Sequence, residues 1–261
     1  MIVEGRDDAS WLKWYFAEHG IDAKAFSVDD RVTVPGDLVS TVHTEINARG
    51  RVIALAVESE MWGLPQPSLT CIIDSDFDIF EPSQTAVSLL KTDYAAMEVY
   101  ALTERPLSKF LIASAKADIQ ASSLTALLKP AWAILYALRY VLHRHGDGAK
   151  LAKKFADKCI NNAGDLVVNA SELLRSSQPS PSRDALSQLL GLHQEYMRAI
   201  PEASLHGIRG HDIAPIIIRF LKLKNELADP KVVEHLMRQS VELIDLDDQP
   251  MFQQLKSRIA N

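Results

Sequence analysis

Short apolar segments alternate with helix-forming segments over the first hundred residues, and this alternation constrains the fold more than any other feature of the sequence. Strand-like segments lie at 2–3, 25–28, 32–34, 39–46, 69–73 and 86–90. Helices are predicted from a cap at Asp7 or Asp8 to a stop at Gly20, over 51–62 and over 94–102. Strands that alternate with helices predict an α/β domain with a mostly parallel sheet flanked by helices.

Strand signals fade after residue 103, and helical signals replace them. Helices are predicted at 106–114, 123–143, 149–160, 171–176, 183–200, 213–223, 231–244 and 250–259, with an exposed loop at 176–182. The predicted architecture is therefore an α/β domain over residues 1–104 and an all-helical domain over 105–261.

The most apolar long stretch, residues 125–142, is interrupted by Lys129, Pro130 and Arg139. Its length and charges favour a buried helix over a membrane span, so no membrane partner is expected. The first residues lack a basic segment followed by a long apolar one, which predicts a cytoplasmic protein.

Composition limits the classes of function. The chain has 261 residues, of which 47% are hydrophobic and 24% are charged, as in a folded globular protein. Its net charge of −6 gives no overall basic field, so nucleic acid binding must depend on local patches or metal ions. Cys71 and Cys159 form no CxxC pair, which argues against a zinc site or disulfide framework and predicts two buried thiols in a reducing compartment.

An acidic segment follows one of the predicted strands. In "CIIDSDFDIF" (71–80), Asp74, Asp76 and Asp78 alternate, and alternate side chains of an extended chain lie on one face about 6–7 Å apart, close enough to hold Mg²⁺. An EF-hand is excluded because Ile79 and Thr85 stand where that loop needs Gly and Glu. The alternative is that these aspartates cap a turn and face water.

A second carboxylate stands at the end of the first predicted strand, where "IVEGRDD" (2–8) places Glu4 before Gly5. Parallel strands end at one edge of a sheet, and ligands bind at that edge in open α/β proteins. We therefore expect Glu4, Asp74 and Asp76 to converge although about seventy residues separate them.

These motifs together resemble a known family. "VEGRDD" and "IIDSDFD" resemble the Glu and DxD of the Toprim fold, and "LLKTDYAAMEVYAL" (89–102), "NARGRVIALA" (47–56) and "RGHDI" (209–213) are similar to segments of a Toprim-like family related to the OLD nucleases. That family, long described as a domain of unknown function, includes the Toprim effector of the PARIS phage-defence system. Two differences stand out: Met1 nearly abuts the first strand, and Val99 stands where Asn often follows the Glu.

The resemblance implies metal-dependent hydrolysis of phosphodiesters in RNA, with tRNA among the candidates, or in DNA. It implies Glu4 as a metal ligand that orients or deprotonates the attacking water, and Lys91 as a group that stabilises the charge developing on phosphate. The implied ligands of Mg²⁺ or Mn²⁺ are Glu4, Asp8, Asp74, Asp76, Asp78 and Glu98. For Glu98 and Lys91 the alternative is an ordinary exposed charge.

Partners follow from the same resemblance. The sequence has no GxxxxGK[ST] motif, so ATP binding through a P-loop is not expected. The resemblance implies an antiphage effector restrained by a partner ABC-type ATPase, which forms a homodimer when released. The alternative is a Toprim-derived regulatory or scaffolding module that acts through protein contacts.

A basic segment follows in the helical half. Residues 139–154 contain Arg139, Arg144, Lys150, Lys153 and Lys154, which are candidates for binding a nucleic acid backbone. A solvated helix end is the alternative. His211 and Asp212 are predicted to begin a helix, with Asp212 near its positive end and His211 a weak candidate for acid–base chemistry.

Overall fold

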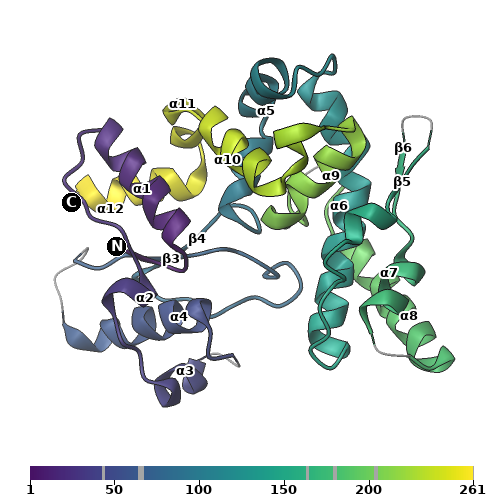
Figure 1. Ribbon diagram of the computed structural model, residues 1–261. Coiled ribbons are helices and arrows are strands. Elements are labelled where there is room, and N and C mark those ends of the chain that lie inside the picture. Colours follow the sequence, from purple (N-terminus) through teal and green to yellow (C-terminus); the bar gives the residue numbers. More distant parts are fainter. Residues whose placement is uncertain (43–44, 64–67, 163–164, 179–180, 203–204, 261) are drawn as a thin grey trace. The chain divides into compact units, whose positions relative to one another are not determined.

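The computed structural model describes residues 1–42, 45–63, 68–162, 165–178, 181–202 and 205–260 (Figure 1). The chain forms two compact units. Unit 1 comprises Met1–Ser75, Pro82–Asp93 and Leu243–Asn261, and unit 2 comprises Asp76–Glu81 and Tyr94–Glu242. These limits differ from the predicted boundary at residue 104, because the C-terminal segment returns to unit 1 and a short part of the acidic segment belongs to unit 2.

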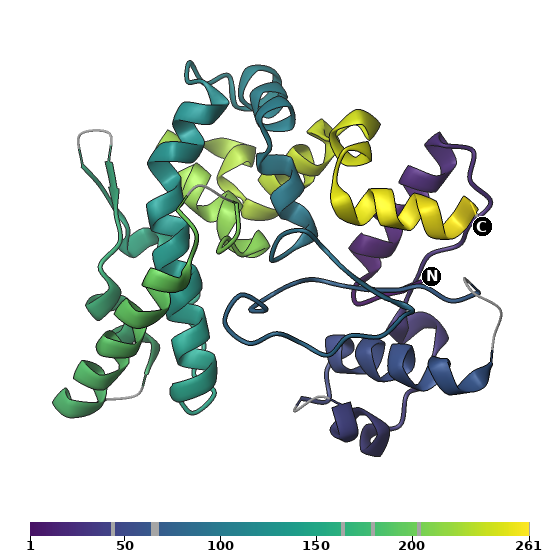
Figure 2. The same ribbon diagram turned by 180° about the vertical axis from the view of Figure 1, so that it is seen from behind.

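Unit 1 is an α/β unit, as predicted. Its four strands are all parallel in the order β2-β1-β3-β4, with Val3 paired to Ser27 and to Ile72. Helix α4 lies on one face of the sheet, and α1 and α12 lie on the other (Figures 1 and 2). Its elements are β1 Ile2–Val3, α1 Arg6–Glu18, β2 Phe26–Ser27, α2 Val28–Arg31, α3 Gly36–Val42, α4 Ala48–Ser59, η1 Glu60–Trp62, β3 Cys71–Ile73, β4 Leu89–Lys91, α11 Leu243–Asp247 and α12 Pro250–Ala260.

The strands of unit 1 are short and buried. Cys71, Ile72 and Ile73 are at most 3% exposed, because helices cover both faces of the sheet. On the α1 side, the Tyr15 ring packs against Phe252 of α12 with ring centroids 4.8 Å apart. This contact attaches the C-terminal helix to the first helix of the unit.

The N-cap of helix α1 lies two residues before Asp7, the earlier of the two predicted caps. Gly5 is the N-cap, so the prediction of Asp7 or Asp8 as the cap is wrong. Both aspartates lie in the first turn instead, where the positive end of the helix favours a negative charge. The predicted stop at Gly20 is confirmed, since Gly20 follows the C-cap His19 with a φ of +64°.

Two predicted strands are wrong, and a third is shorter than predicted. The strand predicted at 25–28 is present as Phe26–Ser27, whereas 32–34 is irregular and 39–42 belongs to helix α3. Pro35 precedes that helix, and Val39 is fully buried from a helical position, so packing overrides its β propensity. Residues 43–44 of the predicted strand lie outside the described part of the chain.

Unit 2 is mainly helical, as predicted for the second half of the chain, with one antiparallel hairpin, β5–β6, that the sequence pattern did not predict. Its elements are η2 Met97–Leu102, α5 Glu104–Phe110, the π-helical turn η3 Leu111–Ala115, α6 Ala121–His145, η4 Phe155–Lys158, β5 Ile160–Asn162, β6 Asp165–Val167, α7 Ala170–Ser177, α8 Arg183–Ala199, α9 Gly210–Leu221, η5 Asn225–Ala228 and α10 Pro230–Ser240.

Helix α6 is the one helix in the described part of the chain that is long and apolar enough to cross a membrane. Of its most apolar eighteen-residue window, 56% is buried inside the protein. Trp132, Leu135, Tyr136 and Leu138 are fully buried, and α8 runs beside the helix (Figures 1 and 2). Helix α6 therefore forms the core of unit 2.

The helix predicted over 149–160 is wrong. Asp147 and Gly148 adopt positive φ angles and end α6, and the chain then forms only the short turn η4 before β5. Leu151, Phe155 and Cys159 have helical spacing, and all three are buried. Irregular turns here bury the same side chains that a helix would have buried, so the apolar period alone misassigned the segment.

Candidate active site at the edge of the sheet

Glu4 and the start of the acidic segment meet at the carboxyl ends of two neighbouring strands. Glu4 follows β1 and Asp74 follows β3, and these strands are paired in parallel. The backbone N–H of Asp74 donates to Oε1 of Glu4 at 3.0 Å. The Glu4 carboxylate therefore lies at the end of β3 beside the Asp74 backbone, whereas the convergence of the two carboxylates on a metal ion stays a prediction.

Arg49 completes this arrangement from helix α4. Its guanidinium donates to the backbone carbonyl of Asp74 and lies 3.5 Å from Oε1 of Glu4. The Arg49 side chain is 10% exposed and that of Glu4 is 22% exposed, so little water screens the pair. Helix α4 can place Arg49 there because Asn47 caps the helix by accepting from the Gly50 N–H at 2.8 Å.

Asp8 lies close to the turn that carries Glu4. A Cβ at Gly5 would come within 2.9 Å of Oδ2 of Asp8, so this carboxylate lies directly against the Gly5 backbone. Glycine between Glu4 and α1 thus leaves room for the Asp8 side chain.

The "TDY" motif holds two parts of unit 1 in place. Thr92 Oγ1 accepts from the Ser75 N–H at 2.9 Å, and the Ser75 hydroxyl donates to the Thr92 carbonyl. Asp93 accepts from the Met251 N–H at the start of α12 at 3.0 Å. These contacts fix the chain directly after Asp74 and anchor the C-terminal helix.

Lys91 is the last residue of β4 rather than the first residue after the strand, because the strand is shifted from the predicted 86–90 to Leu89–Lys91. Its ammonium donates to the Ser83 carbonyl at 3.1 Å. This bond ties the ends of one loop together.

The segment Asp76–Glu81 is held by an aromatic cluster in unit 2. Phe80 packs against Tyr136, Tyr140 and Tyr196, with ring centroids 5.4, 4.7 and 5.0 Å away. Phe77 adds contacts to Tyr136 and Tyr140 at 5.1 and 5.2 Å. We call these five rings the aromatic clamp.

The aromatic clamp also fixes the backbone of Asp76. The Tyr136 hydroxyl donates to the Asp76 carbonyl, and the Asp76 N–H donates to Ala95 O at 3.0 Å. Asp76 has a φ of +41°, a left-handed conformation that Asp and Asn tolerate better than most residues. Asp78 follows within the same segment and is half-buried.

Glu98 is half-buried in unit 2 and is not an ordinary exposed charge. It pairs with Arg238 of α10, and a Cβ at Gly210 would come within 2.9 Å of its Cδ. Glu98 thus lies at the N-terminus of α9, where "RGHDI" begins the helix. His211 of this motif is 71% exposed, and the Glu234 carboxylate, 3.6 Å from its Nδ1, raises the pKa of the imidazole.

The six predicted metal ligands are distributed over both units. Glu4, Asp8 and Asp74 belong to unit 1, and Asp76, Asp78 and Glu98 belong to unit 2. No group of three or more His, Cys, Asp or Glu side chains suited to a metal ion occurs among the residues that the structure describes. The carboxylate oxygens are of the kind that Mg²⁺ prefers, so the donor chemistry fits and their convergence stays a prediction.

The predicted nucleic-acid-binding residues have different environments. Arg139 forms a bidentate pair with the buried Asp212, whereas Arg144 pairs with the exposed Glu81 at 3.1 Å. Lys150, Lys153 and Lys154 are exposed. The two cysteines are buried, as predicted, and burial raises the pKa of Cys71 to about 12 and that of Cys159 to about 11.

Sequence reasoning missed Arg49 and the aromatic clamp. Arg49 lies within "NARGRVIALA" (47–56), but that resemblance assigned it no role, and only the packing of α4 against β3 brings it to Glu4. Phe77 and Phe80 stood within the acidic segment itself, and two apolar rings among its carboxylates were a signal that part of this segment packs against the protein.

No protein-family model matches this chain, and no curated protein sequence matches it. The fold and site define a class only: an α/β unit with a four-stranded parallel sheet and acidic residues at the strand ends, joined to a helical unit.

We expect Phe80→Ala to lower the free energy of unfolding by about 2 kcal/mol, because it removes a half-buried ring from three aromatic neighbours. Hydrogen exchange at Asp76–Glu81 should become faster, as the segment loses one of its two anchoring rings. Ile112→Ala, at a position 75% exposed in the same unit, is the control and should change stability by less than about 0.5 kcal/mol. Unchanged exchange in Phe80→Ala would show that the clamp does not hold the segment.

Proposed function

We propose that this protein is a Mg²⁺-dependent nuclease of the Toprim-like type. The observation that carries the proposal is the hydrogen bond from the Asp74 N–H to Glu4, which joins the ends of two parallel strands at the edge where such sheets bind ligands. The similarity of "VEGRDD" and "IIDSDFD" to Toprim motifs supports the same function.

The chain's own residues have separable tasks in this proposal. Glu4, Asp74 and Asp76 would hold the ion, with Asp8, Asp78 and Glu98 as further candidates. The ion would supply an activated water and neutralise charge on the phosphate. Glu4 would orient the attacking water, and the hydrogen bond from Asp74 keeps its carboxylate in one orientation. Lys91 is the proposed cation for the phosphate oxygens.

From the resemblance alone, the proposal extends to an antiphage effector in the cytoplasm, restrained by a partner ABC-type ATPase and dimeric when released. The substrate is RNA, including tRNA, or DNA.

A second candidate is a non-catalytic regulatory or scaffolding module that binds the ATPase. The observation that favours it is Arg49, whose positive charge lies against Glu4 and offsets its carboxylate without a metal ion. In such a module the strand-end carboxylates would have a structural task.

We expect Glu4→Gln to reduce cleavage of labelled RNA or DNA at least about a hundredfold in Mg²⁺ or Mn²⁺, since the amide is a poor metal ligand and a poor base. The folded state should be retained, because the Gln carbonyl can still accept from the Asp74 N–H. Asp76→Asn should have a similar effect and is preferred to Ala, since Asn tolerates the left-handed φ of this position.

Asp22→Asn is the matched control, an exposed carboxylate of unit 1, and should retain wild-type cleavage. Undiminished cleavage in Glu4→Gln would identify the activity as a contaminant. A wild-type chain that binds no Mg²⁺ in calorimetry and cleaves neither nucleic acid would favour the scaffolding module.

A further inference from the structure

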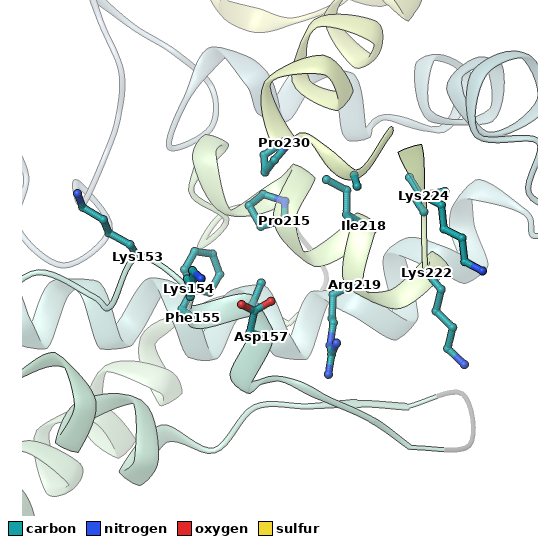
Figure 3. A pocket seen from close by; sticks show the side chains of 13 residues that line it. Lys153, Lys154, Phe155, Asp157, Pro215, Ile218, Arg219, Lys222, Lys224 and Pro230 are labelled. Atoms are coloured by element: carbon teal, nitrogen blue, oxygen red, sulfur yellow. The ribbon is translucent and has the colours of Figure 1, made fainter. Parts of the chain in front are cut away.

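A hollow in unit 2 has an unusual charge for a protein of net charge −6. It lies between η4, α9 and the start of α10, has a volume of about 490 Å³ and is lined by five cationic side chains and one carboxylate (Figure 3). The charged lining residues are Lys153, Lys154, Asp157, Arg219, Lys222 and Lys224. We call this feature the basic hollow.

The floor of the basic hollow is apolar and fixed. Phe155, Pro215, Ile218 and Pro230 contribute to its lining. Phe155 is 6% exposed, and the Arg139 guanidinium lies over its ring 5.3 Å from the centroid. The hollow thus offers an apolar surface to a ligand and cations to the ligand's charged groups.

The cationic side chains differ in the interactions that they already make within the protein. Arg219 donates through Nε to the Cys159 carbonyl at 3.0 Å, which fixes its position. Lys153, Lys154, Lys222 and Lys224 are exposed, and within the described ranges none has an ion pair with a carboxylate. Their charges are therefore available to a ligand.

The lysines lie on opposite sides of the hollow. In Figure 3, Lys153 extends on one side, Lys222 and Lys224 extend on the other, and their amines point away from one another. Such cations do not converge on a single phosphate. They suit a polyanion that crosses the hollow and carries charge on both sides of it.

We infer that the basic hollow binds one nucleotide of a single-stranded nucleic acid, with the base or sugar on the apolar floor and the flanking phosphates at the two lysine edges. The choice of nucleic acid rests on the proposed nuclease function. A nucleic acid strand carries a phosphate on each side of every base, so any base in the hollow brings charge to both edges, whereas an acidic peptide would need a particular sequence. A duplex keeps its bases stacked inside and does not offer one to a hollow of this volume.

The test is fluorescence anisotropy with a short labelled single-stranded RNA in EDTA, so that binding is measured without hydrolysis. Lys153→Gln/Lys154→Gln and Lys222→Gln/Lys224→Gln should each weaken binding on the order of tenfold near physiological salt and lower the salt slope by about 1.4, at roughly 0.7 per lost phosphate contact. Asp157→Asn should strengthen binding, because it removes the one carboxylate that lines the hollow.

Lys13→Gln/Lys24→Gln is the matched control, since it removes the same charge at exposed positions of unit 1 and should change affinity less than twofold. Equal losses in the control and hollow variants, or no loss in the hollow variants, would overturn the inference. An RNA with an abasic linker should bind more weakly than the intact strand, and equal binding would show that no base enters the hollow.

Competitors separate the other occupants. Poly-glutamate that displaces the RNA at equal charge concentration would reassign the hollow to an acidic protein, and a free nucleoside diphosphate that does so would reassign it to a small ligand. Binding in EDTA by a protein that never cleaves RNA would leave this inference standing while the nuclease proposal fails. If the variants that lack the hollow lysines bind and cleave RNA as well as the wild type does, the inference about the hollow fails. The nuclease proposal then still stands.

Discussion

Replacing Arg139 by Met is expected to lower the free energy of unfolding by about 3–5 kcal/mol, because it leaves a carboxylate buried without its partner. Arg139 donates to Asp212 through two nitrogens, with Nε 2.7 Å from Oδ2 and Nη2 2.5 Å from Oδ1. The Asp212 side chain is 1% exposed, so water cannot replace the lost bonds. Urea unfolding followed by far-UV circular dichroism measures the effect.

Arg144→Met is the matched control on the same helix. Arg144 pairs with Glu81 at 3.1 Å, but the two side chains are 41% and 50% exposed, so the loss should be less than about 1 kcal/mol. The double variant Arg139→Met/Asp212→Leu should recover most of the stability, since paired apolar side chains can replace a buried ion pair. A single Arg139→Met variant as stable as Arg144→Met would contradict this account.

Arg139 was predicted from the sequence to bind nucleic acid, and the structure shows why the sequence could not assign its role. The pattern in 139–154 placed five cations close together in the chain, but it gave no information on their partners. Asp212, which lies 73 residues away, takes up the Arg139 guanidinium, whereas Lys153 and Lys154 remain exposed. Side chains that are neighbours in the sequence therefore have different environments in the fold. Arg139 belongs to a buried ion pair, whereas Lys153 and Lys154 belong to a basic surface.

The fold was most predictable where local signals agreed with packing. Helix α8 begins after Ser182, whose hydroxyl accepts from the Ala185 N–H, and it extends over Arg183–Ala199 as its apolar period predicts. The strand ending in Ile73 was found because a short buried apolar run preceded polar residues. In each case the residues that determine the secondary structure also determine which side of the element is buried.

Prediction failed where burial was supplied by distant residues. The β propensity of Val39 favours a strand, but Val39 lies in helix α3 and its side chain is buried there. The hairpin β5–β6 has few β-branched residues. The sequence pattern does not indicate its pairing of Ile160 with Val167, which depends on tertiary structure. At the candidate site, the approach of Glu4 to Asp74 followed from the rule that parallel strands end at one edge, whereas Arg49 followed from no rule.

Arg49→Met is expected to lower the free energy of unfolding by about 3 kcal/mol, at the low end of the cost of breaking a buried ion pair, because Glu4 keeps some contact with water. The loss combines removal of the positive charge beside Glu4 with an Asp74 carbonyl that loses a charged donor. Arg6→Met is the control, since Arg6 pairs with Asp30 at 2.7 Å with side chains 78% and 39% exposed, and its effect should be much smaller than that of Arg49→Met.

A double-mutant cycle with Glu4→Gln isolates the interaction, and a coupling energy of at least about 1 kcal/mol is expected for two groups in direct contact. A coupling energy near zero would mean that the pair is not formed in solution.

The same variant distinguishes the two proposed functions. If Mg²⁺ binds beside Glu4, the ion and Arg49 both neutralise the same carboxylate. A ligand that binds only the native state stabilises it. Saturating Mg²⁺ should therefore recover part of the stability that Arg49→Met loses. The unfolding transition of Arg49→Met should then move to higher urea with added Mg²⁺, and that of Arg49→Met/Glu4→Gln should not. In a scaffolding module the Arg49 charge is the permanent partner of Glu4, and Mg²⁺ should stabilise neither variant.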